Sequence, residues 1–526
     1  MNKNTVLFLV LSVATIGLYF YFFPATKPAN QPAVSQTAPA AVQTNANNEN
    51  VQNAAAAQTV SNSKEQLTTF ATDAYKVVFT NKGAAVKSWQ IKERSGKWID
   101  LVLHKDSTVL ATFPDAAYTL VPQKLPNRIV FEYVSPEGWK IVKAYELSQT
   151  SLMHNLTVTL TKTRSTAKLP EVSLFWGPGL GTDERELREN SSQTRVIAFS
   201  SAKAGALEQI KKGESANAAD FKWAAIDNRY FLVAFIPENS SYFNTITAYQ
   251  HVKKDDLKVV LTATPSADLS SKTLSLALYA GPKGYTYLRS YGLGLEKSIN
   301  FGFFGFLGKI ALLVLYYFSK VTGNFGWGII LVTIVIQILV LPLTLKSFRS
   351  AAAMKRVQPM IKEIQTKYKD DPKRLQAEMM NIYKAQKVNP LGGCLPMLLQ
   401  LPILWAFYTM LRNTYELRNQ PWILWVKDLS AADNFLHLGF SLPFLGSYLN
   451  LLPLIMGVGM FFQQKMMAAS SDPMQRNMMI IMPVLFTVMS WNFPSGLVLY
   501  WLTNSIFSTI VQYMVIRKEA VVVKPA

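Results

Sequence analysis

The chain has 526 residues, of which 49% are apolar and 16% are charged, and its 53 Lys and Arg against 33 Asp and Glu give a formal net charge of +20. Soluble globular proteins carry about 25% charged residues, so long segments of this chain avoid water. The single cysteine, Cys394, excludes an intramolecular disulfide and a cysteine-rich zinc site, and the four scattered histidines offer no metal cluster.

The N-terminal segment is free of charge over residues 6–23, after a single lysine, Lys3. This run is longer than the apolar region of a signal peptide, which has about 7 to 15 residues, so an uncleaved transmembrane signal anchor at 1–23 is favoured over a cleaved signal peptide. Residues 24–66 consist mainly of Ala, Gln, Asn, Thr, Val, Ser and Pro. This composition buries too little apolar surface to fold, which predicts a disordered linker.

Residues 67–292 show the apolar alternation of half-buried strands. Ile129, Phe131 and Tyr133 share one face. The same alternation recurs in Leu156-Thr-Val-Thr-Leu160 and in Leu274-Ser-Leu-Ala-Leu278. Turn signals such as Asn81-Lys-Gly83 separate the runs, and a helix is expected only in stretches such as residues 201–212. The segment is therefore predicted to be an all-β domain of antiparallel sandwich type.

Several motifs resemble catalytic or ligand sites only superficially. Trp139, Trp176 and Trp223 suggest a sugar or peptide groove, but core packing is the favoured interpretation. The glycine run 176–181 reads as a turn, and the Walker-like segment 302–309 has the wrong spacing for a phosphate loop. With no nucleophile elbow and no zinc-protease helix, the sequence predicts no enzyme, no catalytic residue and no cofactor.

Residues 293–320 are predicted to form an amphipathic helix that lies on the outer membrane face. The central part is apolar apart from Lys309. If it crossed the membrane, the basic segment 346–387 would lie outside, against the positive-inside rule. A helix in the interface, with Lys297, Lys309 and Lys320 among the headgroups, satisfies that rule.

The C-terminal 200 residues contain charge-free stretches long enough to cross a bilayer, which takes about 20 apolar residues. These are 321–345, 388–411, 434–462 and 477–516. The last is too long for one span and is interrupted by Trp491-Asn-Phe-Pro-Ser-Gly496, so it is predicted to form two helices. The result is six spans: the signal anchor, a second helix at 321–345 and four more within 388–516, before a tail at 517–526. Two of them, 395–411 and 477–493, are short enough to thin the bilayer.

Lysine and arginine place residues 346–387 in the cytoplasm, because this segment carries eleven of them against four acids. Alternation then puts both termini inside and residues 24–320 outside. Asp371 and Pro372 are the cap and first residue of a new helix, so the segment is predicted to be a helical hairpin. It is either a solvated connector or a contact for lipid headgroups or for nascent chain and ribosomal RNA. The basic residues available for such contacts are Lys355, Arg356, Lys362, Lys367, Lys369, Lys373 and Arg374.

Polar residues inside the predicted spans mark a candidate site, because they are costly in lipid and usually face a cavity or one another. Thr333 and Gln337 lie one turn apart, and Gln400 lies on the next helix. On the last helix, one polar residue recurs every four positions, at Tyr500, Asn504, Ser508 and Gln512. A wet groove and simple interhelical hydrogen bonding explain this pattern equally well.

Four motifs resemble the bacterial YidC membrane-insertase family in its long Gram-negative form. They are Asn389-Pro-Leu-Gly-Gly-Cys-Leu-Pro396, Trp425-Val-Lys-Asp-Leu-Ser430, Asp472-Pro-Met-Gln475 and Phe493-Pro-Ser-Gly-Leu-Val-Leu-Tyr500. The resemblance covers the whole chain. It implies a polytopic α-helical protein of the inner membrane with six spans, five of them around a hydrophilic groove, together with a large all-β periplasmic supersandwich, an interfacial helix and a cytoplasmic helical hairpin.

The resemblance also implies a function without enzymatic chemistry: inserting, folding and helping to assemble inner-membrane proteins. The implied partners are nascent inner-membrane proteins, the Sec translocon, a ribosome or targeting factors at the cytoplasmic face, and anionic lipids. Groove or substrate contacts carry over to Thr333, Gln337, Leu401, Leu404, Tyr500 and Trp501. The sequence departs from the family pattern at one of them, because Gln337 stands where the pattern has an arginine, five residues before Pro342-Leu-Thr344.

Two other functions fit parts of the sequence. A solute transporter would use the polar residues as a binding site, but it predicts internal repeats with broken helices, and the sequence has no such repeat. A periplasmic binding module anchored by its helices explains neither a five-helix core nor a basic hairpin.

Overall fold

The computed structural model describes residues 65–201, 205–250, 257–266, 269–369, 371–386, 388, 395–442, 445–467 and 473–522. The predicted signal anchor, nearly all of the predicted linker and the end of the C-terminal tail lie outside the described residues. So does most of the motif that begins at Asn389.

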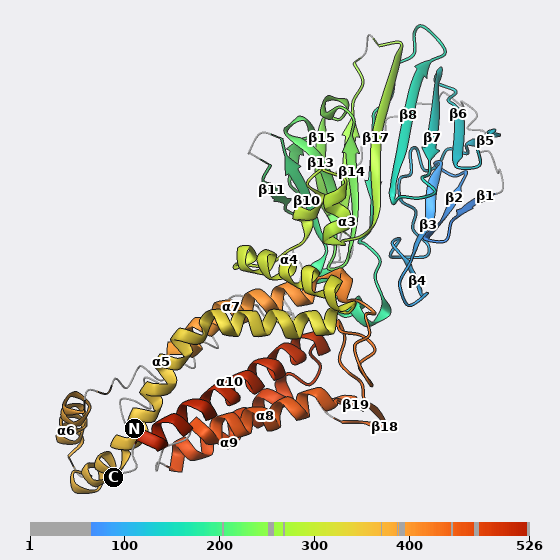
Figure 1. Cartoon of the computed structure of the whole chain (residues 1–526). Helices are drawn as coiled ribbons and strands as arrows, with labels where there is room; N and C mark the ends of the chain where they lie inside the picture. The colour runs from blue at the N-terminus through green and yellow to red at the C-terminus, as the bar shows by residue number, and fades with distance from the viewer. Residues whose placement is uncertain are drawn as a thin grey trace, which may run out of the picture. The chain divides into compact units, whose positions relative to one another are not determined.

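A nine-stranded antiparallel sheet forms the centre of the β-domain, the part of the chain that comprises residues 67–282 (Figure 1). Its order is β11-β10-β13-β14-β17-β8-β7-β6-β5. The strands are β5 (Thr119–Val121), β6 (Arg128–Val134), β7 (Trp139–Glu146), β8 (Met153–Lys162), β10 (Arg195–Ser200), β11 (Leu207–Ile210), β13 (Phe221–Asp227), β14 (Phe231–Pro237) and β17 (Ser271–Pro282).

Two four-stranded sheets complete the β-domain, in the orders β1-β2-β3-β4 and β12-β15-β16-β9. Their strands are β1 (Leu67–Ala71), β2 (Tyr75–Thr80), β3 (Ala85–Lys92), β4 (Trp98–Asp100), β9 (Val172–Trp176), β12 (Ser215–Asn217), β15 (Thr245–Gln250) and β16 (Leu257–Ala263). One continuous apolar core joins residues from all three sheets. A second core covers the residues of β10, β13 and β14 that point the other way, and α3 (Tyr285–Ser290) contributes Leu288 to it. The predicted antiparallel sandwich is therefore present, in three sheets.

The alternation read from the sequence matches the burial of the strands. Ile129 and Phe131 of β6 are buried, and the leucines of β8 and β17 at positions 156, 160, 274, 276 and 278 are at most 1% exposed. All three tryptophans considered for a groove are buried, so core packing is their role. Asn81-Lys-Gly83 forms the turn between β2 and β3, with Gly83 in the left-handed region at φ 65°.

The helix expected at residues 201–212 is wrong. Its described second half contains β11, which pairs antiparallel with β10 from Phe199↔Leu207 to Val196↔Ile210. The side chains of Leu207 and Ile210 pack on the sheet, and this pairing with a neighbouring strand overrides a weak local helical preference. Besides α3, the short α2 (Leu187–Gln193) is the other α-helix described in this part of the chain.

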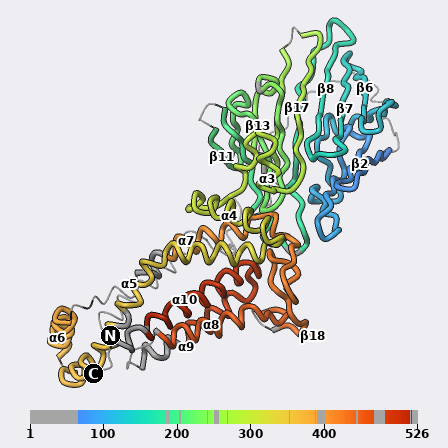
Figure 2. Tube along the Cα trace, viewed as in Figure 1, coloured from blue at the N-terminus to red at the C-terminus, as the bar shows by residue number. Residues whose placement is uncertain are grey.

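The helical part follows the β-domain in sequence (Figure 2). Its helices are α4 (Gly305–Thr322), α5 (Phe325–Lys367), α6 (Pro372–Ala385), α7 (Leu395–Asn413), α8 (Leu451–Met467), α9 (Pro473–Met489) and α10 (Ser495–Val522). α4 and α5 are long and apolar enough to cross a membrane, α5 over Phe325–Ser350. The interfacial placement of α4 thus depends on the charge rule and not on its length. α10 packs mainly against α5 and α8, whereas α7 packs mainly against α4.

The second span and the first arm of the hairpin form one helix. α5 runs for 43 residues without interruption and has Pro342 and Pro359 inside it. The boundary expected between 345 and 346 is therefore a change of environment and not a break in the backbone. The second arm is as predicted: α6 begins at Pro372, and the carboxylate of Asp371 accepts a hydrogen bond from the Arg374 amide at 3.1 Å.

The span expected over residues 434–462 is only partly helical. Its first half is a β-hairpin of β18 (Leu436–Leu442) and β19 (Gly446–Leu449), in which Gly439 and Gly446 have positive φ. The Asp433 carboxylate accepts hydrogen bonds from the amides of Leu451 and Leu452, at 2.8 and 2.9 Å, which fixes the start of α8. The two short helices differ from their expected bounds by a few residues, since α7 ends at Asn413 and α9 occupies Pro473–Met489. Residues 490–494 form the expected turn between α9 and α10.

Candidate functional site

The last helix has the reverse of a soluble amphipathic pattern. On α10, Tyr500, Ser508 and Gln512 are buried and Asn504 is half-buried. The opposite face carries exposed apolar side chains at Ile506, Ile510, Tyr513 and Met514, each about half exposed to its surroundings. An exposed apolar face of this size is typical of a surface that meets lipid, whereas polar residues within a span usually face a cavity or one another.

Four polar side chains from three helices meet and are called the polar cluster here: Gln337, Gln400, Tyr500 and Asn504. The side-chain amide of Gln337 donates to the Asn504 carbonyl oxygen. The Gln400 amide donates to the same oxygen at 3.3 Å and to the Tyr500 hydroxyl at 3.4 Å. α5, α7 and α10 are thus linked through one asparagine. None of the four side chains is ionised at neutral pH, so the polar cluster is polar and uncharged.

The remaining polar residues of these helices lie near the polar cluster without joining it. Thr333 is fully buried, and its hydroxyl donates at 2.7 Å to the Ile329 carbonyl of its own helix. Farther along α10, the buried Gln512 has a side-chain oxygen with no hydrogen-bond partner among the described residues. A buried acceptor without a partner is rare, and it retains the capacity to accept a hydrogen bond from another molecule.

The apolar candidates lie apart from the polar cluster. Leu401 is 47% exposed on α7, and Leu404 packs at the edge of the helical core. Trp501 packs edge-on against Phe486 and at a tilt against Phe493, with ring centroids 4.6 and 5.8 Å away, so it contacts both α9 and the α9–α10 turn.

One polar link was missed from the sequence. The Ser505 hydroxyl donates to the side-chain oxygen of Gln463 at 3.0 Å, which joins α10 to α8. Gln463 directly follows the apolar run 451–462 of α8 and precedes Gln464 and Lys465, and a polar residue at the end of an apolar run is the signal by which it could have been found.

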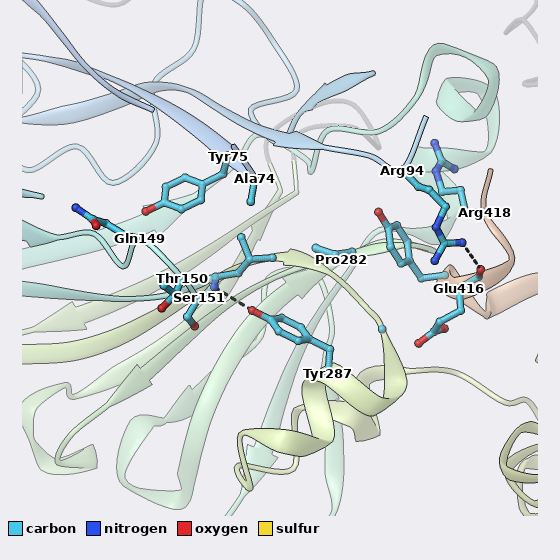
Figure 3. Close-up of a pocket in the computed structure, with 13 residues that line it drawn as sticks. Ala74, Tyr75, Arg94, Gln149, Thr150, Ser151, Pro282, Tyr287, Glu416 and Arg418 are labelled. Carbon is cyan, nitrogen blue, oxygen red and sulfur yellow. Dashed lines mark hydrogen bonds between the residues drawn. The ribbon is translucent and has the colours of Figure 1, made fainter. Parts of the chain in front are cut away.

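Two cavities flank these helices. One, of about 240 Å³, is lined only by apolar side chains of α4, α5 and α7, among them Ile310, Leu339 and Ile403. The other, of about 440 Å³, lies between the β-domain and the loop after α7, where Tyr75, Tyr287 and Arg94 line it (Figure 3). No group of three or more His, Cys, Asp or Glu able to hold a metal occurs among the residues with described placement.

The described basic residues of the hairpin formed by the end of α5 and by α6 face away from its seam. Val357 and Ile361 of α5 are buried, whereas the described basic side chains are exposed. Those exposed are Arg356, Lys362, Lys367, Lys369, Lys373 and Arg374. The side chain of Lys355 lies outside the described set. This arrangement places these side chains on the surface of the hairpin.

Two family models match the chain, described as "60Kd inner membrane protein" over residues 317–521 and "YidC periplasmic domain" over residues 98–313. A protein of Endomicrobium trichonymphae named membrane protein insertase YidC is 53% identical over 530 residues, and the alignment covers 100% of both chains. A protein of the same name from Syntrophobacter fumaroxidans is 37% identical over 80% of this chain and 76% of its own.

A solved structure of an active YidC insertase with its first transmembrane domain is similar over 86% of this chain and 93% of its own, at 19% identity and a TM-score of 0.40.

Proposed function

The chain belongs to the YidC family of membrane protein insertases, and we propose that it moves apolar segments of inner-membrane proteins from the cytoplasm into the bilayer and helps them to fold and assemble. It is a membrane protein with a periplasmic domain, and it is not an enzyme. The comparisons give no support to the solute-transporter alternative. Insertion is proposed to need no nucleotide, and to proceed alone or with the Sec translocon.

The observation that carries the mechanism is the buried polar face of α10 with the polar cluster on it. A polar segment that crosses lipid must leave its backbone groups unpaired, at several kcal/mol each. The amides and hydroxyl of Gln337, Gln400, Tyr500 and Asn504 offer donors and acceptors within the membrane. They are proposed to line a hydrophilic groove with Thr333, Ser508 and Gln512, while Leu401, Leu404 and Trp501 receive the apolar segment.

Helix length supports the same path. α8 and α9 have 17 residues each, or about 25 Å at 1.5 Å per residue, against a hydrocarbon core of about 30 Å. Short spans thin the surrounding bilayer. A thinner bilayer shortens the distance over which the polar segment travels without water.

Gln337 changes how clients are attracted. In the family pattern an arginine at this position would draw acidic segments into the groove by charge. With an amide there, the proposed groove of this chain hydrates the passing segment and does not select it by charge.

Partners beyond the client proteins are proposed from the hairpin. Its exposed lysines and arginines suit a ribosome, a targeting factor or anionic lipids at the cytoplasmic face, because phosphates are the common feature of these surfaces. The Sec translocon is proposed as a partner from family membership.

Six spans, with both termini in the cytoplasm of a bacterial cell and the β-domain in its periplasm, are proposed as the topology in the inner membrane. The proposed domains are the signal anchor 1–23, linker 24–66, β-supersandwich 67–292, interfacial helix 293–320, second span 321–345, hairpin 346–387, spans three to six in 388–516, and tail 517–526. The basis is the charge distribution of the sequence.

Labels at Lys3, Lys369 and Lys524 are expected to react from the cytoplasmic side, and a label at Lys253 from the periplasmic side, because the basic segments stay inside. The measurement is the reaction of single cysteines with a membrane-impermeant reagent, in intact cells and in inverted vesicles. Protection of position 369 in inverted vesicles would refute the topology.

Reconstitution tests the function itself. The purified protein in liposomes, without nucleotide, is expected to insert a small single-span protein, measured by protection of its translocated tail from added protease. Liposomes with a polytopic membrane protein of another family are the control. Equal protection in both preparations would overturn the proposal.

A further inference from the structure

Three carboxylates of the β-domain and its adjoining loop converge on one point. Glu93 follows β3, and Asp183 and Glu186 lie in or beside the short helix η1 (Glu184–Glu186). The side chains of Glu93 and Asp183 are 1% exposed, and that of Glu186 is 20% exposed. Lys97 of the β-domain contacts Asp183 at 3.2 Å.

A positive charge that pairs with these carboxylates comes from the helical part of the chain. Arg418, just after η6 (Tyr415–Leu417), has a side chain that is 3% exposed and lies among these acids. Its Nε donates to Glu93, its Nη1 donates to Glu186 at 2.6 Å, and its Nη2 lies 3.4 Å from Asp183. The guanidinium also lies over the Tyr230 ring, 4.8 Å from its centroid. We call Arg418 and the three carboxylates the arginine cage.

The charges of the arginine cage are complementary across the contact between the β-domain and the loop after α7. Burial alone would lower the pKa of Arg418, but the carboxylates of Glu186 and Glu93 more than offset it, so its pKa is raised above the ordinary value. Without Arg418, Glu93 and Glu186 would lose the guanidinium that pairs with them while they remain largely buried. Removing one partner of a buried ion cluster is strongly unfavourable, because the remaining charges stay desolvated.

Further contacts hold the same loop, as Figure 3 shows for Arg94 and Glu416. Arg94 donates to the Glu416 carbonyl at 3.3 Å, and the Glu416 carboxylate accepts from the Tyr285 amide at 2.8 Å and from the Tyr316 hydroxyl. The Tyr230 hydroxyl donates to the Arg412 carbonyl at 3.2 Å. The outer end of α7 is thus attached to the β-domain, to the start of α3 and to α4.

α7 is the helix that this attachment can influence. It carries Gln400 of the polar cluster and continues directly into the loop that ends at Arg418. Its packing against α5 and α10 is slight compared with its packing against α4. The position of α7 therefore depends on what holds its outer end.

We propose that the arginine cage is a latch that docks the β-domain onto the outer end of α7 and thereby sets the distance from α7 to α10 across the polar cluster. The proposal rests on the proposed function only for its effect on insertion. The docking itself is a structural statement, testable without any client.

Spin labels measure the docking in the full-length protein. With Cys394 replaced by serine, labels at the exposed Lys212 and Ile506 report the β-domain against α10, and labels at Leu401 and Ile506 report α7 against α10. In reconstituted protein both distance distributions are expected to be narrow. Arg418→Met is expected to broaden both, and Arg418→Lys to broaden them less, because lysine keeps the charge without the planar fork.

Arg128→Met is the control, because Arg128 pairs with Glu146 within the β-domain and the two side chains are 45% and 46% exposed. It should leave both distributions narrow. A second arm combines Arg418→Met with Glu93→Gln and Glu186→Gln; if the cage is a latch, the combined variant is no broader than Arg418→Met alone. Unchanged distributions in Arg418→Met, measured on protein with an unaltered β-domain melting transition, would overturn the latch.

Measuring the insertion rate distinguishes a failure of the latch proposal from a failure of the proposed function. Arg418→Met is expected to lower the insertion rate at least threefold together with the broader α7–α10 distance. Broad distances with an unchanged rate would remove the coupling to the groove while leaving the docking and the insertase function intact.

Discussion

Gln337→Leu is expected to lower the insertion rate by about five- to a hundredfold. The substitution removes the hydrogen bond to Asn504 and the only groups that α5 contributes to the polar cluster. A polar group of the client left unpaired in a desolvated site costs about 1–3 kcal/mol, and each 1.4 kcal/mol of barrier is about tenfold in rate. The measurement is the initial insertion rate per folded molecule in liposomes, with folded protein quantified by its melting transition.

Two further variants give this experiment its controls. Gln337→Arg is expected to retain more activity than Gln337→Leu, because a guanidinium still offers donors, and to favour clients with acidic translocated segments. Thr344→Val is the matched control on the same helix: the Thr344 hydroxyl donates to the Val340 carbonyl of α5 at 3.1 Å and makes no contact with the polar cluster. A destabilised Gln337→Leu protein with a normal insertion rate would mean that Gln337 serves only to join helices.

Asp227→Asn is expected to destabilise the β-domain by about 3–5 kcal/mol, the usual cost of breaking a buried ion pair from one side. Asp227 is fully buried at the end of β13. It accepts hydrogen bonds from Arg195 at 3.1 and 2.7 Å and from Lys283 at 2.8 Å. The measurement is denaturant unfolding followed by tryptophan fluorescence.

The pH dependence of the same variant identifies the cause. Burial already lowers the pKa of Lys283, and Asp227 opposes that shift, so the variant should lower it further. The unfolded state then binds more protons than the folded state at neutral pH, so stability rises with pH. The deficit of Asp227→Asn should therefore shrink between about pH 7 and pH 10, towards the ordinary lysine pKa. Glu146→Gln, at an ion pair with Arg128 in which the side chains are 46% and 45% exposed, is the control and should cost at most about 1 kcal/mol. If the loss of unfolding free energy in Asp227→Asn were the same at every pH, it would be due to packing and not to the charge of Lys283.

Most of the fold could be predicted from local sequence patterns. Alternation found β6, β8 and β17 because one face of each strand is buried, and Asp371-Pro372 found the start of α6 because capping is a local interaction. The region around 201–212 could not be read in this way. β11 is a strand only because β10 lies beside it, and a sequence window contains no information about that neighbour.

The candidate site, too, could be predicted only in part from local sequence patterns. The spacing of Tyr500, Asn504, Ser508 and Gln512 predicted one shared face of α10, and three of the four are buried there. It could not predict that Gln337 and Gln400 converge on one oxygen of Asn504, since that depends on how three helices pack. Arg418 lies 325 residues from Glu93 in the chain, so nothing in the local sequence indicates their pairing.

The unbroken length of α5 makes it one continuous rod. At about 1.5 Å per residue its 43 residues measure about 64 Å, about twice the roughly 30 Å hydrocarbon core of a bilayer. Because a continuous helix contains no loop, a force applied at the hairpin end is transmitted along α5 towards Gln337. Pro342 lies between the two and lacks the amide that would hydrogen-bond to residue 338, so part of such a force bends the helix there before it reaches Gln337.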